Sequence, residues 1–194
     1  MENNKGFTGN AECKFKDGSF YEGEWVNGLP EGYGTMVFAN KDKYVGDWNE
    51  GKMNGVGIYR FYNSSSQEFS AVYRGEFVDG RREGRGKMTY ANNDVYVGTW
   101  QNNMRTGSGV MWFRTGDRFS GLWKYDKMLR GVYCKYDGEK YDGEIKDGHF
   151  EGFGKYYWKD GNWFEGTFKQ GQPYNGIVIS ADCAIAEYIE GELR

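Results

Sequence analysis

The sequence predicts an all-β fold: a single-layer, twisted antiparallel meander of tandem β-hairpins that forms an elongated rod. Three observations predict it: a unit of about 23 residues recurs along the chain, aromatic residues and glycines alternate within each unit, and turn residues separate the alternating segments. The 194 residues include 31 glycines, and 19% are aromatic. Disordered chains are poor in aromatic residues, so this composition favours an ordered fold whose core consists of Tyr, Trp and Phe.

The first half of each unit has the pattern aromatic-x-Gly-x-aromatic. It begins at Tyr21, Tyr44, Tyr73, Tyr96, Phe119, Tyr141 and Phe164. Successive side chains of a strand point to opposite faces, so in YEGEW the residues Tyr21, Gly23 and Trp25 share one face. Stacked units should therefore form columns of rings along one face, with a column of glycines between them. We expect the rings to lie against the backbone of these glycines and to exclude water there.

The second half of each unit predicts the return strand of a hairpin. Asn27-Gly28 is a typical hairpin turn, and the strand after it alternates again, so that the glycines of GYG (Gly32 and Gly34) face the rings. Three methionines of these return strands, Met36, Met88 and Met111, point to the same face, where we expect them in the core. A further turn, such as residues 40–42, leads to the next hairpin.

This register divides the chain into seven repeats between two partial ones. Residues 1–20 form an N-terminal cap, residues 21–188 hold the seven repeats, and residues 189–194 form a C-terminal cap. In this last cap, residues 189–193 resemble a weakened first half of a repeat, with Gly191 at the strand glycine. An inserted loop at about residues 62–71 separates the second and third repeats. In the fifth repeat, Leu129 replaces a glycine and Lys135 replaces the aromatic residue before the turn. In the sixth, Ile145 replaces Trp or Phe, so these two repeats have fewer rings.

The register YxGEWxxGxxxGxGxxxYxxG resembles the MORN (membrane occupation and recognition nexus) repeat family over roughly residues 9–192. The resemblance implies a repeat array without catalytic activity. Members act as scaffolds at cytoskeletal and membrane-associated structures, including cilia and flagella. Some bind partner helices or peptides along the aromatic groove, and lipid binding has been proposed for others. We therefore expect a cytoplasmic protein, with the cytoskeleton and the cilium among its locations.

The sequence offers no catalytic, metal or cofactor site. His149, the one histidine, lies in a predicted turn, and Cys13, Cys134 and Cys183 are widely spaced. The GxG pairs lie within strands, whereas a dinucleotide fingerprint opens a helix. A net charge of −3 does not favour nucleic-acid binding, and there is no apolar run of membrane-spanning length. We expect a protein that is not an enzyme and binds no cofactor.

The sequence predicts a scaffold that binds a partner helix or extended peptide through its aromatic, glycine-troughed face. The expected contacts are the rings in the middle of the array and three methionines on a rim formed by the hairpin turns. They are Tyr44, Trp48, Tyr73, Phe77, Tyr96, Trp100, Phe119 and Trp123, with Met53, Met104 and Met128 beside Leu29 and Phe150 on the rim. An alternative remains for each of these rings, namely that core packing uses them up.

Three further hypotheses remain open. Arg81, Arg82, Arg85 and Lys87 could bind an anionic lipid such as a phosphoinositide. The chain could be the regulatory array of an enzyme complex. It could also form a homodimer through its edge strands or its aromatic face. The acidic residues beside the glycine column (Glu24, Asp47, Glu76 and Glu144) should lie solvated on the face opposite the rings.

Overall fold

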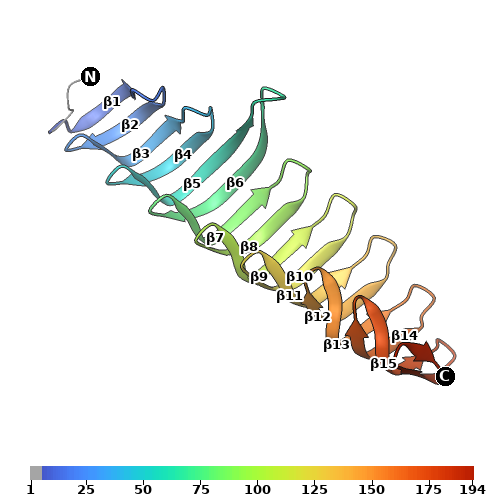
Figure 1. Cartoon of the computed structure of the whole chain (residues 1–194). Coiled ribbons are helices and arrows are strands. Elements are labelled where there is room, and N and C mark those ends of the chain that lie inside the picture. Colours follow the sequence, from blue (N-terminus) through green and yellow to red (C-terminus); the bar gives the residue numbers. More distant parts are fainter. Residues whose placement is uncertain (1–5) are drawn as a thin grey trace. The chain divides into compact units, whose positions relative to one another are not determined.

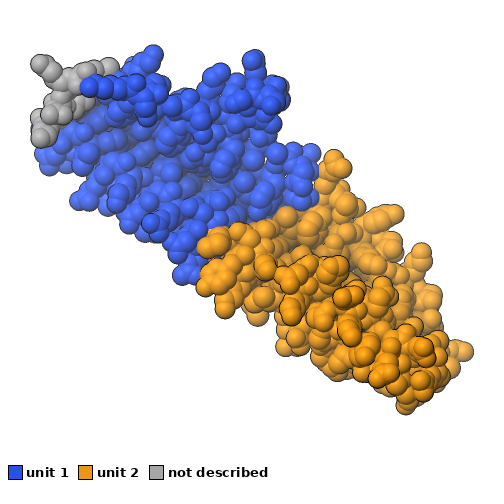
Figure 2. Space-filling view, viewed as in Figure 1, with its two compact units in different colours: residues 1–103 blue, residues 104–194 orange. Residues whose placement is uncertain are grey.

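The computed structural model describes residues 6–194, which form strands and turns and no helix. Two compact units are distinguished, residues 1–103 and residues 104–194 (Figures 1 and 2). The first contains β1 (Gly9–Lys14), β2 (Phe20–Val26), β3 (Leu29–Val37), β4 (Lys43–Asn49), β5 (Lys52–Asn63), β6 (Glu68–Val78), β7 (Arg81–Thr89) and β8 (Val95–Gln101). The second contains β9 (Met104–Trp112), β10 (Arg118–Lys124), β11 (Lys127–Cys134), β12 (Lys140–Lys146), β13 (His149–Tyr157), β14 (Trp163–Lys169), β15 (Gln172–Ile179), β16 (Ile185–Ile189) and β17 (Glu192–Leu193).

Within each unit, every strand pairs antiparallel with the strands that precede and follow it in the sequence. The glycine column fixes the register: Gly23 lies opposite Gly34, and Gly34 lies opposite Gly46. The predicted fold class, an antiparallel meander of hairpins, is confirmed. The elongated rod remains a prediction.

The first ring of each repeat lies directly on the glycine trough. Tyr21 is fully buried, and a Cβ atom added to Gly34 would lie 2.2 Å from its hydroxyl oxygen. No residue except glycine leaves room for this ring, which explains the glycines inside these strands. The Tyr21 hydroxyl crosses the trough and donates a hydrogen bond to the Glu24 carbonyl oxygen at 3.1 Å.

The rings also pack against one another from repeat to repeat. Trp48 lies between Tyr21 and Tyr44, with ring centroids 5.2 Å and 5.3 Å apart and near-perpendicular planes. Edge-to-face pairs of this kind contribute roughly 0.5–1.5 kcal/mol beyond the area they bury. The indole Nε1 of Trp48 donates to the Gly34 carbonyl oxygen at 3.2 Å. Met36, Met88 and Met111 are buried beside the rings, as the sequence predicts.

The stability of this core should fall at high pH. Burial, and after it the nearby charges of Glu24 and Glu31, raises the pKa of Tyr21 from 10.0 to about 12. A tyrosine whose pKa is raised by folding stabilises the fold fully below pH 10, and this contribution is lost as the pH rises towards 12. Denaturation midpoints measured between pH 9 and pH 12 should therefore decrease more in the wild type than in Tyr21→Phe. Phe119 shows that phenylalanine fits this position. An equal decrease in both proteins would contradict the expectation.

The acidic residues beside the glycine column have a role that the sequence analysis missed. Asp47 Oδ2 accepts a hydrogen bond from the Val56 backbone N–H at 2.8 Å, where a β-bulge shifts the register of β4 and β5. Gly55 has φ +85° there, and an added Cβ would lie 2.6 Å from the carboxylate. Glu24 and Glu76 accept the equivalent N–H groups in their repeats. Glu24, Glu76 and Glu144 are exposed on the face opposite the rings, as the sequence predicts. The hydrogen bonds of Glu24, Asp47 and Glu76 to the bulges are the additional role.

The inserted segment at residues 62–71 is not a loop. β5 and β6 continue through most of it, Tyr62 pairs with Phe69, and the turn is confined to residues 64–67. Figure 1 shows this hairpin reaching beyond the neighbouring hairpins of its unit. The rings of Tyr62 and Phe69 contact each other at the end of this extension, with centroids 5.8 Å apart.

The C-terminal partial repeat is phased differently from the prediction. Gly191, which the predicted register puts in a strand, lies with φ +87° in the turn between β16 and β17. Its backbone N–H donates to the Tyr174 carbonyl oxygen, as turn glycines do in earlier repeats. The last first-half strand is therefore β16.

Candidate partner-binding groove

The rings predicted to contact a partner belong to the core. None is more than 5% exposed, and the set comprises Tyr44, Trp48, Tyr73, Phe77, Tyr96, Trp100, Phe119 and Trp123. Their edge-to-face contacts and the glycine trough use their surfaces in folding. In this conformation a partner does not reach them, so any binding surface on this face must be formed by residues outside these two columns.

The methionines of the predicted rim lie on two faces of the sheet. Met53 is opposite Trp48 and Met128 is opposite Trp123, so both are on the ring face. At the position equivalent to theirs, β9 has Arg105, whose guanidinium lies over Trp123. Met104 directly precedes Arg105, so its side chain lies on the face opposite the rings. Leu29 lies on that face too, because it precedes Pro30, which is opposite Trp25. The predicted rim follows the hairpin turns but is divided between the two faces, because an offset of one residue moves a side chain to the opposite face.

A second row of aromatic residues lies beside the buried columns. Tyr59, Tyr133 and Tyr156 take the place that Met36, Met88 and Met111 have in other repeats. The Tyr59 hydroxyl donates to Asp42 Oδ2 at 2.8 Å, and the Tyr133 hydroxyl donates to Asp117 Oδ2 at 2.9 Å. Tyr156 donates in the same way to Glu139. Each hydroxyl thus anchors its ring to the strand end opposite the hairpin turns.

Each of these tyrosines lines a hollow on the ring face. In the first unit, a hollow of about 200 Å³ lies among Met53, Tyr59, Phe61 and Arg82. In the second unit, one of about 760 Å³ is lined by Phe113, Met128, Tyr133, Ile145 and Phe150, and one of about 430 Å³ by Phe150, Tyr156, Trp158 and Pro173. Concave apolar surface therefore remains after the core has closed.

Fixed charges border the hollows of the second unit. Glu139 accepts from the Lys135 ammonium at 2.7 Å, and this bond, together with the one from Tyr156, lowers the pKa of the Glu139 carboxyl. Burial opposes the charge on Lys135, but its hydrogen bonds with Glu139 and Tyr156 outweigh burial and raise its pKa. Burial likewise opposes ionisation of Asp117, yet the Tyr136 N–H and the Tyr133 hydroxyl lower its pKa. All three groups stay charged at neutral pH.

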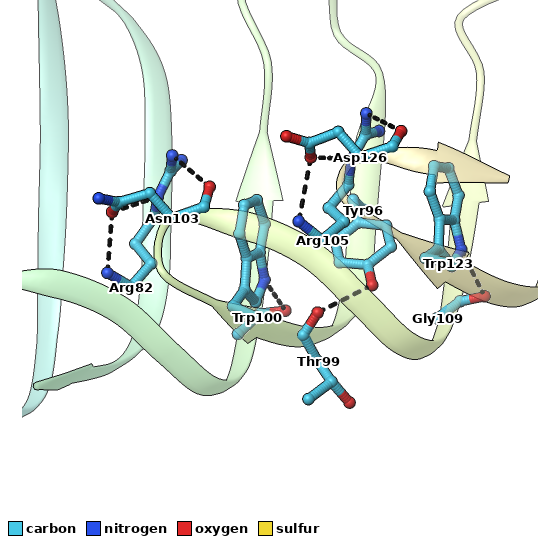
Figure 3. A network of polar contacts seen from close by, with 10 residues as sticks. Arg82, Tyr96, Thr99, Trp100, Asn103, Arg105, Gly109, Trp123 and Asp126 are labelled. Atoms are coloured by element: carbon cyan, nitrogen blue, oxygen red, sulfur yellow. Dashed lines mark hydrogen bonds and ion pairs between the residues drawn. The ribbon is translucent and has the colours of Figure 1, made fainter.

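An arginine takes the methionine position in the third repeat, and a turn residue holds it (Figure 3). The backbone N–H and Nε of Arg82 donate to Asn103 Oδ1 at 2.9 Å and 3.3 Å, and its Nη2 donates to the Asn103 carbonyl oxygen at 2.9 Å. The guanidinium lies 4.6 Å from the Trp100 ring centroid. Asn103 has φ +68° at a turn position where other repeats have glycine.

The second unit repeats this arrangement with Arg105, Asp126 and Trp123 (Figure 3). Asp126 Oδ1 accepts from Arg105 Nε at 2.8 Å, and the guanidinium lies 4.5 Å from the Trp123 centroid. The signal in the sequence was the loss of the turn glycine in two repeats, each with an arginine at the start of the preceding return strand. Neither member of the pair is informative alone.

We expect Arg82 and Asn103 to be energetically coupled. Arg82→Met should lower the free energy of unfolding by about 1–2 kcal/mol, because it removes charge-assisted hydrogen bonds and the contact with Trp100. The double variant Arg82→Met/Asn103→Gly recreates the pairing of Met53 with Gly80, where the glycine N–H donates to the Met53 carbonyl oxygen. Its cost should be smaller than the sum of the two single costs by about 0.5–3 kcal/mol in urea denaturation. Strictly additive costs would show that the pair is independent.

Comparison with known proteins gives the family of the chain. The model of the MORN repeat matches residues 21–43, 44–66, 73–95, 96–118 and 141–163, which is more than half of the sequence. This chain belongs to the MORN repeat family. The predicted MORN repeats that begin at Phe119 and Phe164 lie outside the matched residues. They fold into the same hairpin, with Gly121 opposite Gly131 and Gly166 opposite Gly176.

Several solved structures resemble the MORN chain at low sequence identity. The TCP domain of SAS-4 (dCPAP) from Drosophila melanogaster, in complex with a proline-rich motif of Ana2 (dSTIL), is 12% identical over 95% of this chain and 88% of its own, with a TM-score of 0.49. The TCP10 domain of Danio rerio CPAP is 14% identical over 95% and 97%, with a TM-score of 0.32. Such values support no inference about function. None of the curated proteins compared with the chain matches it.

One of the four residues of the basic cluster in the third MORN repeat lies on the other face of the sheet from the rest. Arg82 lies on the ring face opposite Phe77 and is held by Asn103, whereas Arg81 pairs with Val78 and Lys87 with Arg74 on the other face. Arg81, Arg85 and Lys87 remain exposed on that face, so alternation removes only Arg82 from the predicted cluster.

Residues 6–194 contain no group of three or more His, Cys, Asp or Glu side chains arranged to hold a metal ion. In the same part of the chain, no helix has the length and apolar character needed to cross a bilayer.

Proposed function

We propose that this MORN array is a non-enzymatic scaffold that binds a helix or an extended peptide of a partner protein along its ring face. The observation that carries the proposal is the concave apolar surface that remains beside a closed core, in particular the hollows beside Met53 and Met128. Apolar side chains of a partner would fill these hollows, and the flexible methionines would adapt to them. A cytoskeletal, ciliary or membrane-associated location is part of the proposal and rests on the family alone.

The hollow of each unit is suited to binding because few side chains must reorganise. Tyr59 and Tyr133 are already anchored by hydrogen bonds to Asp42 and Asp117, so their rings need not be ordered when a partner arrives. The carboxylates of Asp42 and Asp117 accept hydrogen bonds from these two hydroxyl groups. A partner that covers the carboxylates leaves these hydrogen bonds in place. Affinity would come from a few apolar anchors in the hollows.

The test is affinity capture from cells with matched glutamate variants, followed by mass spectrometry. Met53→Glu and Met128→Glu place a charge on the ring face at the mouths of two hollows, and Met104→Glu places the same charge on the opposite face. A specific partner should be retained by the wild type and by Met104→Glu and lost from the other two, with all four proteins folded by circular dichroism. A partner that all four retain, or that only Met104→Glu loses, would refute the ring face as the site.

The lipid hypothesis needs a separate measurement, because no observation favours it over a protein partner. Sedimentation with vesicles that contain phosphatidylinositol phosphates measures it directly. Pelleting of the wild type that Arg85→Glu and Lys87→Glu abolish, without capture of a protein partner, would replace the scaffold proposal by a lipid-binding one.

A further inference from the structure

The series of edge-to-face rings is interrupted in the sixth repeat. In the second unit, Phe119 contacts Trp123, and Tyr141 contacts Phe168 in the next repeat, with centroids 5.4 Å and 4.9 Å apart. The position between Phe119 and Tyr141 belongs to Ile145, which stands where other repeats have Trp or Phe. An isoleucine is smaller than an indole and has no ring edge or face, so it leaves part of the space of a tryptophan unfilled.

Phe150 packs differently from the other rings beside this position. It lies opposite Ile145 on the return strand and stacks flat on Tyr141, with centroids 3.9 Å apart and planes at 13°. The neighbouring contact of Tyr141 with Phe168 is edge-to-face at 84°. The stacked Phe150 ring forms one wall of the hollow of about 760 Å³, Met128, Tyr133 and Phe113 line it further, and Ile145 contributes to its lining.

We propose that this hollow receives an aromatic side chain of the partner, a tryptophan or a phenylalanine, which completes the ring series that Ile145 interrupts. The inference rests on the proposed scaffold function and names the partner residue that this hollow of the ring face receives. The chemistry of the walls favours a ring: Tyr133 and Phe113 supply aromatic surface for offset or edge-to-face contacts, and the Met128 thioether interacts favourably with aromatic rings.

The charges around the hollow specify the neighbours of this anchor. Asp117 and Asp137 line its mouth, and the Asp117 carboxyl is held ionised by hydrogen bonds from Tyr136 and Tyr133. The Lys135 ammonium, the cation beside them, is paired with Glu139. The mouth is therefore acidic, and we assign the occupant as an aromatic residue flanked by lysine or arginine.

The probes are three acetylated, amidated pentapeptides, Gly-Lys-Trp-Lys-Gly, Gly-Lys-Leu-Lys-Gly and Gly-Glu-Trp-Glu-Gly, titrated into the whole chain and followed by methyl NMR of Ile145 and Met128. The Lys-Trp-Lys peptide should bind at least tenfold more tightly than either of the others and should shift both methyl signals. Equal binding of the leucine peptide, or no shift at Ile145 and Met128, would overturn the inference.

Ile145→Trp supplies the missing ring from the chain itself. This variant should raise the melting temperature and lose at least tenfold in affinity for the Lys-Trp-Lys peptide. Phe153→Trp, an exposed position on the other face of β13, is the matched control and should bind as the wild type does. Retained binding by a folded Ile145→Trp protein would refute the site, and Ile145→Phe serves the same purpose if the larger ring prevents folding.

The two proposals fail separately. If a cellular partner is lost from Met128→Glu but retained by Ile145→Trp, the scaffold stands and the aromatic anchor is wrong. If no partner depends on Met53 or Met128 while the peptide still binds at Ile145, the hollow is an aromatic-binding site, and the scaffold proposal is wrong.

Discussion

Replacing Trp48 with alanine is expected to lower the free energy of unfolding by about 3–5 kcal/mol, the range for large aromatic residues in protein cores. Trp48 is one of the rings that are at most 5% exposed, and it fills the space between Tyr21 and Tyr44. Its removal also leaves the Gly34 carbonyl oxygen without the indole hydrogen bond. The neighbouring glycines have no side chains that could collapse into the cavity, so little of the cost should be recovered. Urea denaturation followed by circular dichroism measures it.

Trp112→Ala is the matched control, because this indole is 42% exposed and stands outside the ring series. Its cost should stay below about 1 kcal/mol, since surface substitutions usually have small effects. Trp48→Phe should recover most of the stability, because Phe77 occupies the same position in the third repeat. If Trp48→Ala and Trp112→Ala lower the free energy of unfolding equally, Trp48 is not a core residue and remains a predicted partner contact.

The repeat register made much of this fold predictable. Two-residue alternation assigns Tyr21 and Trp25 to one face, and repetition turns one strand into columns, so the meander and the glycine trough follow without knowledge of any distance. The prediction that rings lie on glycines is supported in detail by Tyr21 on Gly34. Met36 follows from the same alternation.

The depth of burial and the hollows could not be predicted in the same way. Alternation gives the face of Trp48 but not its exposure, which depends on how closely the rings of adjacent repeats approach one another. The hollow at Ile145 depends on Tyr133 being drawn to Asp117, a hydrogen bond from β11 to the turn between β9 and β10 in the preceding repeat. The misplacement of Met104 has a simpler cause, an offset of one residue at a turn.

Substitution of a trough glycine should be as damaging as the loss of a ring. A Cβ atom added to Gly57 would lie 2.3 Å from the Tyr44 ring, and Gly57 does not have a positive φ, so alanine would be excluded by contact and not by backbone conformation. Tyr44 cannot move aside freely, because its hydroxyl donates to the Asp47 carbonyl oxygen at 2.9 Å and its edges contact Trp48 and Phe77. Overpacking of this kind usually costs about 1–3 kcal/mol, and we expect Gly57→Ala to exceed about 3 kcal/mol.

Two comparisons separate this steric cost from other effects of replacing glycine. Gly171 has φ +85° and nothing within 4 Å of an added Cβ, so Gly171→Ala should cost only the backbone strain, about 1 kcal/mol. In the background Tyr44→Leu, whose shorter side chain does not reach across the trough, Gly57→Ala should cost much less than in the wild type. Urea denaturation of the four variants gives both differences. If Gly57→Ala lowers the free energy of unfolding equally in the Tyr44→Leu background, the backbone requires glycine at this position and the Tyr44 ring does not.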